Sequence, residues 1–481
     1  MLSFGEIARF AGTFAEVLFL FNVLIVVHEL GHFLAARSRG LRVERFQIWF
    51  GAPIWEKEVG GVVYALGWIP AGGFVALPQM AGAELLEGRS ESGAEVLPPV
   101  KPWDKILVAV AGPVANLLLA VVFSLIVWVV GRPVSQGEAT TTIGYVFPDS
   151  PAEKAGLKPG DRLLLVDGHP VHRFQGMDDT AITWNIVRSE GSEIPITLER
   201  EGKVLSVSVA PVREERGFLQ RKGLRQILIL PEETPTIARV FPKSPAAGAG
   251  LRPGDQVLSV DGVRLLSPIA LNDYMIKHPG KSLSLEVVRE GRSRSVEIVP
   301  EVPVSETVPR IGLQWDLAGT MSIVHPNPQE QILASVRAMT STVAAMLSPR
   351  SDIKPQHLSG PVGIMRLYYL LFQSPYGWRL ALWFSVLFNV NVALLNLMPI
   401  PVLDGGHILL SLAEWVRGRP LNLRVLEALQ VIFATLIVGF ILYVTFFDVQ
   451  DLPWRGGGKG PEMHFPASTH PGAPSSEPQS P

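Results

Sequence analysis

The stretch LIVVHELGHFLAA, residues 24–36, places two histidines and a glutamate inside a run that is otherwise apolar enough for lipid. Burying such groups in hydrocarbon costs free energy unless they are paired or bind a metal. His28, Glu29 and His32 form the pattern H-E-x-x-H, which on a helix projects both histidines from one face. That pattern predicts two nitrogen ligands for zinc, with a carboxylate beside the water that the metal activates. Two surface histidines on a soluble helix are the alternative.

The composition of the chain favours a membrane protein. Its 481 residues are 47% hydrophobic and 18% charged, whereas soluble proteins average roughly 25% charged residues. Residues 14–36, 106–130 and 426–447 are apolar runs long enough to span a bilayer, and a shorter run covers residues 380–397. The net charge of -2 gives no reason to expect nucleic acid as a partner, and the lack of cysteine excludes disulfides and thiolate zinc ligands.

Basic residues predict how these spans are oriented. Clusters follow the first span, precede the second and lie between the last two: Arg37, Arg39, Arg42, Arg45, Lys101, Lys105, Arg417, Arg419 and Arg424. The positive-inside rule puts all three clusters in the cytoplasm if the N-terminus is outside. The segment 131–379 and the C-terminal tail are then external.

The external segment contains an internal repeat. SPAEKAGLKPGDRLLLVDG begins at Ser150 and SPAAGAGLRPGDQVLSVDG begins at Ser244. Each copy predicts a short helix, a Pro-Gly turn, a strand and an Asp-Gly turn. The wording resembles PDZ domains of bacterial proteases, which bind an extended peptide at a sheet edge. Two packing modules without a free groove are the alternative, and Gly223-Leu224 is a candidate carboxylate loop of the second module.

A catalytic zinc needs a third protein ligand and one open position. No further histidine closely follows His32, so a distant carboxylate is expected. The stretch NLMPIPVLDGGHILL supplies Asp404 near the cytoplasmic end of the span at 380–397, at the same depth as His28 and His32. An ordinary turn carboxylate is the alternative interpretation of Asp404, and His407 is a rival ligand.

The same stretch predicts a break in the helix. Pro399 and Pro401 interrupt it, and Gly405 and Gly406 allow close approach of backbone. Non-helical backbone at membrane depth is tolerated where it lines a cavity or is buried in protein. We therefore expect irregular backbone beside the metal site.

Together these motifs resemble the site-2 protease family, and most closely its bacterial branch. H-E-x-x-H in the first span, NLMPIPVLDGG in the third and PDZ modules between the second and third spans carry the resemblance. VHELGHFLAAR, AGPVANLLLA and LSGPVGI also match, so the likeness runs from residue 1 to about residue 448. Residues 62–78 resemble the family's membrane-entering β-hairpin, whose exposed edge can pair with an unwound substrate.

The resemblance implies a function for each matched residue. It implies zinc (Zn2+) on His28, His32 and Asp404, with Glu29 as the general base. Asn391 and Asn396 match asparagines implicated in substrate binding, and polar contacts between helices are their alternative role. Asn116, within AGPVANLLLA, is interpreted as a helix-packing residue.

We therefore expect a multi-span α-helical membrane protein with about four transmembrane helices, a membrane-entering β-hairpin and two external α+β PDZ-like domains. The expected segments are 1–134 (first two spans, HExxH and hairpin), 135–222 and 223–303 (PDZ-like domains), 304–378 (amphipathic linker), 379–450 (last two spans) and 451–481 (disordered tail). The resemblance places the protein in a bacterial inner membrane with its PDZ-like domains in the periplasm.

The implied activity is that of a zinc metalloendopeptidase that cuts transmembrane segments within the lipid bilayer. Its substrates are single-span membrane proteins first shortened by a site-1-type protease, such as anti-sigma factors or signal-peptide remnants. An inactive membrane-anchored PDZ scaffold is the alternative, but it predicts loss of Glu29 or a ligand. A transporter predicts more spans and inverted repeats, and a PDZ-bearing serine protease needs a nucleophile motif that the sequence lacks.

Overall fold

The computed structural model describes residues 4–80, 100–217, 220–304, 306–316, 319–419 and 423–452. Within these ranges, four helices are long and apolar enough to cross a membrane. They are α1 (Phe4–Ser38), α3 (Pro102–Val130), α11 (Gly377–Asn396) and α13 (Leu423–Gln450). Each apolar run singled out in the sequence falls almost wholly within one of them. The predicted tail lies outside the described residues from residue 453 on.

Helix α3 forms the centre of the helical part. It packs against α1, against α11 and against the shorter α12 (Asp404–Arg417), while α13 packs on α10 (Pro361–Phe372). The approach of α1 to α3 is close, because a Cβ at Gly31 would lie 2.5 Å from the carbonyl oxygen of Ala111 and 2.8 Å from the Cβ of Ala115. Small residues at such crossings bring two backbones together. This crossing places the middle of α3 against the H-E-x-x-H turn of α1.

The predicted helix break is present between α11 and α12. Helix α11 ends at Asn396, Pro399 and Pro401 occupy the connection, and α12 begins at Asp404. A Cβ at Gly405 would lie 2.3 Å from the carbonyl oxygen of Leu397, so the connection folds tightly onto the start of α12. Proline cannot donate the helical hydrogen bond and glycine permits this approach. The break therefore brings a carboxylate, rather than another apolar turn, to the helix start.

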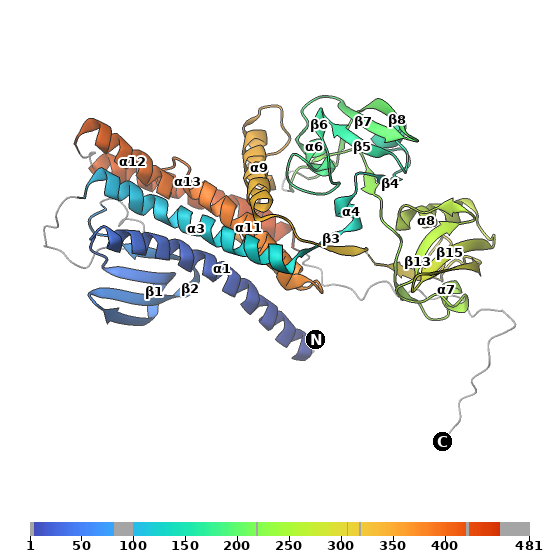
Figure 1. Ribbon diagram of the computed structural model, residues 1–481, viewed down its shortest axis with the longest axis horizontal. Helices are drawn as coiled ribbons and strands as arrows, with labels where there is room; N and C mark the ends of the chain where they lie inside the picture. The colour runs from blue at the N-terminus through green and yellow to red at the C-terminus, as the bar shows by residue number, and fades with distance from the viewer. Residues whose placement is uncertain are drawn as a thin grey trace, which may run out of the picture.

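Residues 45–76 form a small sheet beside α1, built from β1 (Arg45–Val59) and β2 (Val62–Ala76) (Figure 1). Residues 45–48 pair on one side with residues 63–66 and on the other with residues 73–76, while residues 53–59 pair with 62–67. The expected hairpin at 62–78 is therefore wrong in detail. Its two arms lie on opposite sides of residues 45–48 and do not pair with each other. Gly72, with a φ of 70°, allows the chain to turn between these arms.

The repeat forms two modules with the same sheet order. The first has β6-β5-β7-β8 and the second β14-β13-β15-β16. The first comprises β4 (Ile143–Val146), α5 (Pro151–Lys154), β5 (Arg162–Val166), β6 (His169–Pro170), α6 (Ile182–Arg188), β7 (Ile194–Arg200), β8 (Lys203–Val209), β9 (Val212–Arg213), β10 (Arg225–Gln226) and β11 (Ile229–Pro231). The second comprises β12 (Ile237–Val240), α7 (Pro245–Gly248), β13 (Gln256–Val260), β14 (Val263–Arg264), α8 (Pro268–Lys277), β15 (Leu283–Arg289), β16 (Arg292–Ile298) and β17 (Leu313–Trp315).

The local structure within each repeat follows the sequence. The hydroxyls of Ser150 and Ser244 accept backbone hydrogen bonds that cap α5 and α7. Asp167 and Asp261 have positive φ, and each precedes a glycine with positive φ in the turn after β5 or β13. Such paired positive φ angles are those of tight hairpin turns. The predicted helix, strand and Asp-Gly turn are present in both copies.

The boundary between the modules differs from the expected one at residues 222 and 223. Strand β11 pairs with β4, and Ile227 is buried in the core of the first module. Strand β17 pairs with β12, and Ile311 and Leu313 are buried in the core of the second. The candidate loop Gly223-Leu224 therefore belongs to the first module. In each module, the last strand lies C-terminal to the repeated sequence and pairs with the first strand of the module. The repeated sequence alone does not predict this strand.

Short elements connect the modules to the helices. Strand β3 (Arg132–Ser135) follows α3 and pairs with β18 (Met321–Val324), so the chain enters and leaves the modules through one ladder. After β3 comes α4 (Gln136–Ala139); after β18 come α9 (Pro328–Leu347) and a 3-10 turn (Pro355–His357) before α10. The modules lie at the end of the helices opposite α12 and the sheet of β1 and β2 (Figure 1).

Candidate metal centre

The three predicted ligands lie together where α1 meets the start of α12. Nε2 of His28 lies 3.3 Å from Oδ2 of Asp404, and Nε2 of His32 lies 3.4 Å from Oδ1 of the same carboxylate. The two Nε2 atoms are 3.2 Å apart. The three side chains are 12–18% exposed. Among the described residues, this is the one group of histidine and carboxylate side chains whose ligand atoms lie close enough together to hold a metal ion.

These distances fit a tetrahedral zinc site. Zinc binds histidine nitrogen at about 2.0–2.1 Å and carboxylate oxygen at about 2.0–2.2 Å, so two ligands of a tetrahedron are roughly 3.3–3.5 Å apart. The separations of 3.3 and 3.4 Å lie within this range, and that of 3.2 Å lies just below it. The carboxylate atom Oδ2 is also buried without a hydrogen-bond partner. Two imidazoles and one carboxylate leave a fourth position open, which is the composition of a catalytic zinc site.

Glu29 lies beside this group and keeps its carboxylate free of hydrogen bonds within the described part of the chain. A Cβ at Gly73 would lie 3.1 Å from Cγ of Glu29 and 3.5 Å from Cγ2 of Ile25. Residues 73–76 therefore run directly alongside the H-E-x-x-H turn. Their outer side pairs with no strand among the described residues, so this strand is an edge of the sheet, and its face at Gly73 lies against Glu29.

Helix α3 provides a second layer behind both histidines. The backbone carbonyl of Val108 lies 2.8 Å from Nδ1 of His32, and the side-chain amide of Asn116 lies 3.2 Å from Nδ1 of His28. Between them, a Cβ at Gly112 would lie 2.2 Å from Nε2 of His32. Residues 108, 112 and 116 are spaced by four and share one face of the helix. The sequence alone favours a helix-packing role for Asn116. The spacing of four residues between Gly112 and Asn116 in AGPVANLLLA is the signal that places both on one helix face.

The other predicted site residues are His407, Asn391 and Asn396, and they lie outside the group of three. His407 is one turn further along α12 and is not part of the compact group. Asn391 is in α11 with its side-chain oxygen buried and unpartnered, and Asn396 is the last residue of that helix. No contact tests the substrate-binding role of these asparagines, which stays a prediction.

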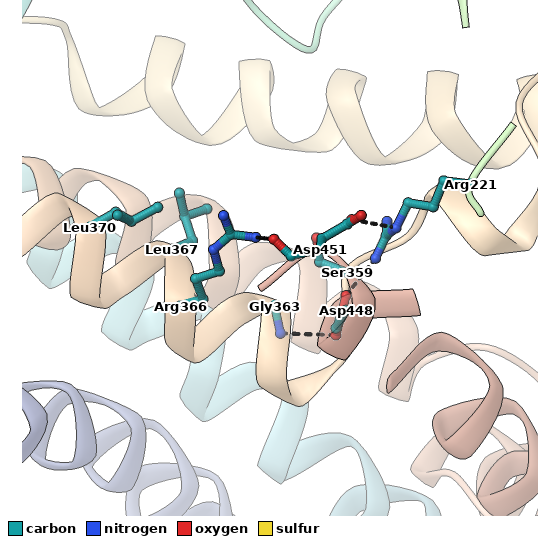
Figure 2. Close-up of a pocket in the computed structure, with 8 residues that line it drawn as sticks. All are labelled: Arg221, Ser359, Gly363, Arg366, Leu367, Leu370, Asp448 and Asp451. Carbon is teal, nitrogen blue, oxygen red and sulfur yellow. Dashed lines mark hydrogen bonds and ion pairs between the residues drawn. The ribbon is translucent and has the colours of Figure 1, made fainter. Parts of the chain in front are cut away.

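A second polar cluster ties the first module to the helices, as Figure 2 shows. The buried carboxylate of Asp448, near the end of α13, accepts hydrogen bonds from the backbone of Gly360 and Gly363 at 2.9 Å each. Arg221, from the loop between β9 and β10, donates to the same carboxylate at 2.6 Å. Asp448 therefore holds the start of α10 and the first module together. The cluster is not among the groups of ligand atoms that lie close enough to hold a metal ion in the part of the chain that the structure describes.

A second contact fixes the first module to the membrane part of the chain. Ala181 and Trp184, at the start of α6, are buried against Ala345 and Ile353, near and beyond the end of α9. Such buried apolar contacts hold two elements in one relative position. The first module is therefore attached to the helices by a small apolar core and by several ion pairs, those of Arg213 and Arg225 with Asp352 as well as that of Arg221 with Asp448.

Comparison with known proteins identifies the family of this chain. The family model of peptidase family M50 matches residues 16–440, most of the chain. The chain therefore belongs to peptidase family M50, the site-2 proteases, as its motifs predict. It is a multi-pass membrane protein and a zinc metalloprotease of the site-2 type.

Curated relatives match the chain over nearly its whole length. A Neisseria meningitidis protein, described by its name as a zinc metalloprotease, is 30% identical over 89% of this chain and 97% of its own. The regulator of sigma-E protease RseP from Escherichia coli K12 and that from Salmonella typhimurium are each 29% identical, over 90% of this chain and 98% of theirs. The resemblance to the bacterial branch of the family is confirmed.

One solved structure similar to part of the chain is the PDZ domain of an SdrC-like protein from Listeria monocytogenes. It is 21% identical and covers 18% of this chain and 95% of its own, with a TM-score of 0.17. That score is too low to assign a fold to either module.

Proposed function

We propose that His28, His32 and Asp404 hold the zinc ion and that Glu29 is the general base for hydrolysis of a peptide bond within the membrane. The observation that carries this proposal is the spacing of 3.2–3.4 Å between the converging nitrogen and oxygen atoms, with a free carboxylate beside them. When bound, zinc supplies a Lewis acid that polarises a carbonyl and lowers the pKa of water. The inactive-scaffold alternative has no support, since Glu29 and all three ligands are present.

The chain's own residues then divide the work of hydrolysis. Glu29 takes a proton from the attacking water and delivers it to the nitrogen of the leaving amine. A substrate helix hides its carbonyl groups, so the segment to be cut has to unwind first. The free edge of residues 73–76 offers backbone groups for pairing with that extended segment. Asn391 and Asn396 complete the proposed substrate-binding surface.

The orientation of the protein follows from the basic clusters. We place the loops with Arg37 to Arg45, Lys101 and Lys105, and Arg417 to Arg424 in the bacterial cytoplasm. The two modules then lie on the periplasmic side of the inner membrane. We place the zinc ligands towards the cytoplasmic side, because His28 and His32 lie in the second half of α1 and Asp404 follows α11 at the start of α12. Helix α12 lies at the end of the helices opposite the modules (Figure 1).

The proposed substrates are single-span membrane proteins that a site-1-type protease has already shortened. Support comes from the relatives, two of which are named regulator of sigma-E protease RseP, and from the site's depth in the helices. Anti-sigma factors and signal-peptide remnants have the required form. The repeated modules, which we propose to be PDZ-like, lie on the side where such a substrate carries its external domain.

Removal of each ligand tests the proposed metal centre. Purified protein should contain about one zinc per chain, and His28→Ala, His32→Ala and Asp404→Ala should each lose it, because two remaining ligands hold the ion weakly. Zinc per chain is measured by atomic emission after gel filtration in detergent. His407→Ala is the matched control and should retain zinc. Retention of zinc by Asp404→Ala together with its loss from His407→Ala would make His407 the third ligand.

We propose further that the modules act as a gate that excludes substrates with bulky external domains. The alternative is that they recruit substrate through a terminal carboxylate. A deletion of residues 141–316, closed by a short glycine linker, leaves the β3–β18 ladder intact. A gate predicts that this variant cuts an untrimmed substrate, with the trimmed form cut about as fast as before. Recruitment predicts slower cutting of the trimmed form.

A point variant keeps the test valid if the deletion variant does not fold. Arg221→Leu removes the ion pair that ties the first module to Asp448 and keeps both modules. It should admit part of the untrimmed substrate in the same cleavage assay, whereas Arg216→Leu, at an exposed ion pair of the same loop, should not. If both the deletion and Arg221→Leu still refuse the untrimmed form, the gate is wrong.

A further inference from the structure

We propose that Asn116 is a positioning residue for the metal centre: its side-chain oxygen accepts a hydrogen bond from Nδ1 of His28 and holds the imidazole with Nε2 towards the metal. This inference rests on the proposed zinc site. It concerns a residue of α3 that touches neither the ion nor the substrate and acts only through the histidine.

The argument starts from the chemistry of an imidazole ligand. A histidine that binds a metal through Nε2 carries its proton on Nδ1, and that proton needs an acceptor to fix the tautomer and the ring. In this structure, the Nε2 atoms of both histidines converge on Asp404. Both Nδ1 atoms therefore face away from the metal and towards α3.

For His32 the acceptor is plain. Its Nδ1 lies 2.8 Å from the backbone carbonyl oxygen of Val108, which can only accept. For His28 the atom at 3.2 Å belongs to the side-chain amide of Asn116, which offers both an oxygen and an NH2 group. An asparagine amide is oriented by its hydrogen-bond partners, and a half-turn exchanges its oxygen and nitrogen without moving other atoms.

The tautomer that binds zinc decides which end of the amide faces His28. Asn116 is fully buried, and its Oδ1 has no hydrogen-bond partner when Nδ2 is the atom next to the histidine. Turning Oδ1 towards the Nδ1–H of His28 supplies the acceptor that this tautomer requires, and Nδ2 then takes the unpartnered position that Oδ1 holds now.

The layout of α3 gives a geometric reason for this pair of contacts. Val108 and Asn116 are eight positions apart on one face, with Gly112 midway between them. A Cβ at Gly112 would lie 2.8 Å from Cε1 of His28 and 2.2 Å from Nε2 of His32, so the rings occupy the space that a side chain would take. The glycine admits the two rings, and its neighbours on either side hold their Nδ1 atoms.

The zinc dissociation constant of the full-length protein in detergent, measured by competition with a fluorescent chelator, tests the inference. Asn116→Leu keeps the approximate volume but removes the acceptor, and should raise the dissociation constant about 10–100-fold. Asn116→Asp retains an acceptor oxygen and should bind zinc within a few-fold of the wild type. If Asn116→Leu does not fold, Asn116→Ala takes its place with the same expectation.

Asn389→Leu is the matched control. Asn389 is also buried in a membrane helix, but its amide donates to Ser385 within α11 and contacts neither histidine. This variant should keep the wild-type zinc affinity. Equal affinity of Asn116→Leu and the wild type would overturn the inference, as would an Asn116→Asp variant as weak as Asn116→Leu. His28→Ala separates the two proposals, because only failure of the zinc site itself lets that variant keep its zinc.

Discussion

Glu29→Gln should lower cleavage of a single-span substrate by at least about 100-fold and as much as 10,000-fold, the range supplied by a positioned general base. Glutamine has nearly the same shape but cannot take a proton from the attacking water. Because Glu29 is not one of the three residues whose ligand atoms converge, the variant should still contain zinc at the wild-type level. Cleavage is followed by gel shift of a trimmed substrate in detergent, with zinc measured on the same preparation.

The combination of lost cleavage and retained zinc distinguishes the base from a ligand. Glu16→Gln is the matched control, since Glu16 lies in the same helix α1 with an exposed side chain and should cut at the wild-type rate. Cleavage by Glu29→Gln within a few-fold of the wild type would remove Glu29 from the mechanism. Loss of zinc from that variant would instead make Glu29 part of the metal centre.

The convergence of His28, His32 and Asp404 was predictable because each of these residues lies in a recognisable sequence motif. His28 and His32 are four residues apart, so any helix places them on one face. Asp404 is far away in the sequence, but it follows a proline-interrupted run, and the basic clusters put it at the same depth as the histidines. Apolar runs and basic clusters predict the depth of a residue in the membrane, and this prediction can be compared between residues that are far apart in the sequence. The histidines and Asp404 could therefore be assigned to one site before the structure was known.

Other features depend on pairings that no local pattern records. Strands β11 and β17 close their modules by returning to β4 and β12, so the module boundary falls beyond the repeated wording. Residues 45–48 separate the two arms of the expected hairpin, because strand order in a sheet is decided by non-local hydrogen bonds. The role of Asn116 also required knowing that α1 crosses α3 closely at Gly31. In all three cases, the missing information was which distant backbone lies next to the segment.

Gly112→Ala should weaken zinc binding and reduce cleavage by about 100-fold or more, although it adds a single methyl group. That methyl would lie 2.2 Å from Nε2 of His32 and 2.8 Å from Cε1 of His28, closer than atoms can approach. The ring of His32 cannot simply retreat, because its Nδ1 is held by the carbonyl of Val108 and its Nε2 faces Asp404.

Relief therefore requires α1 and α3 to move apart or the rings to leave their ligand positions. A displacement of about 1 Å at a reacting centre is enough to cost 100-fold in rate. Gly439→Ala in α13 is the matched control, because a Cβ there meets no atom within 4 Å, and it should retain both zinc and cleavage. Zinc affinity and cleavage of the two variants are compared at equal folded concentration. A Gly112→Ala protein that binds zinc and cuts like Gly439→Ala would mean that α3 does not support the two histidines.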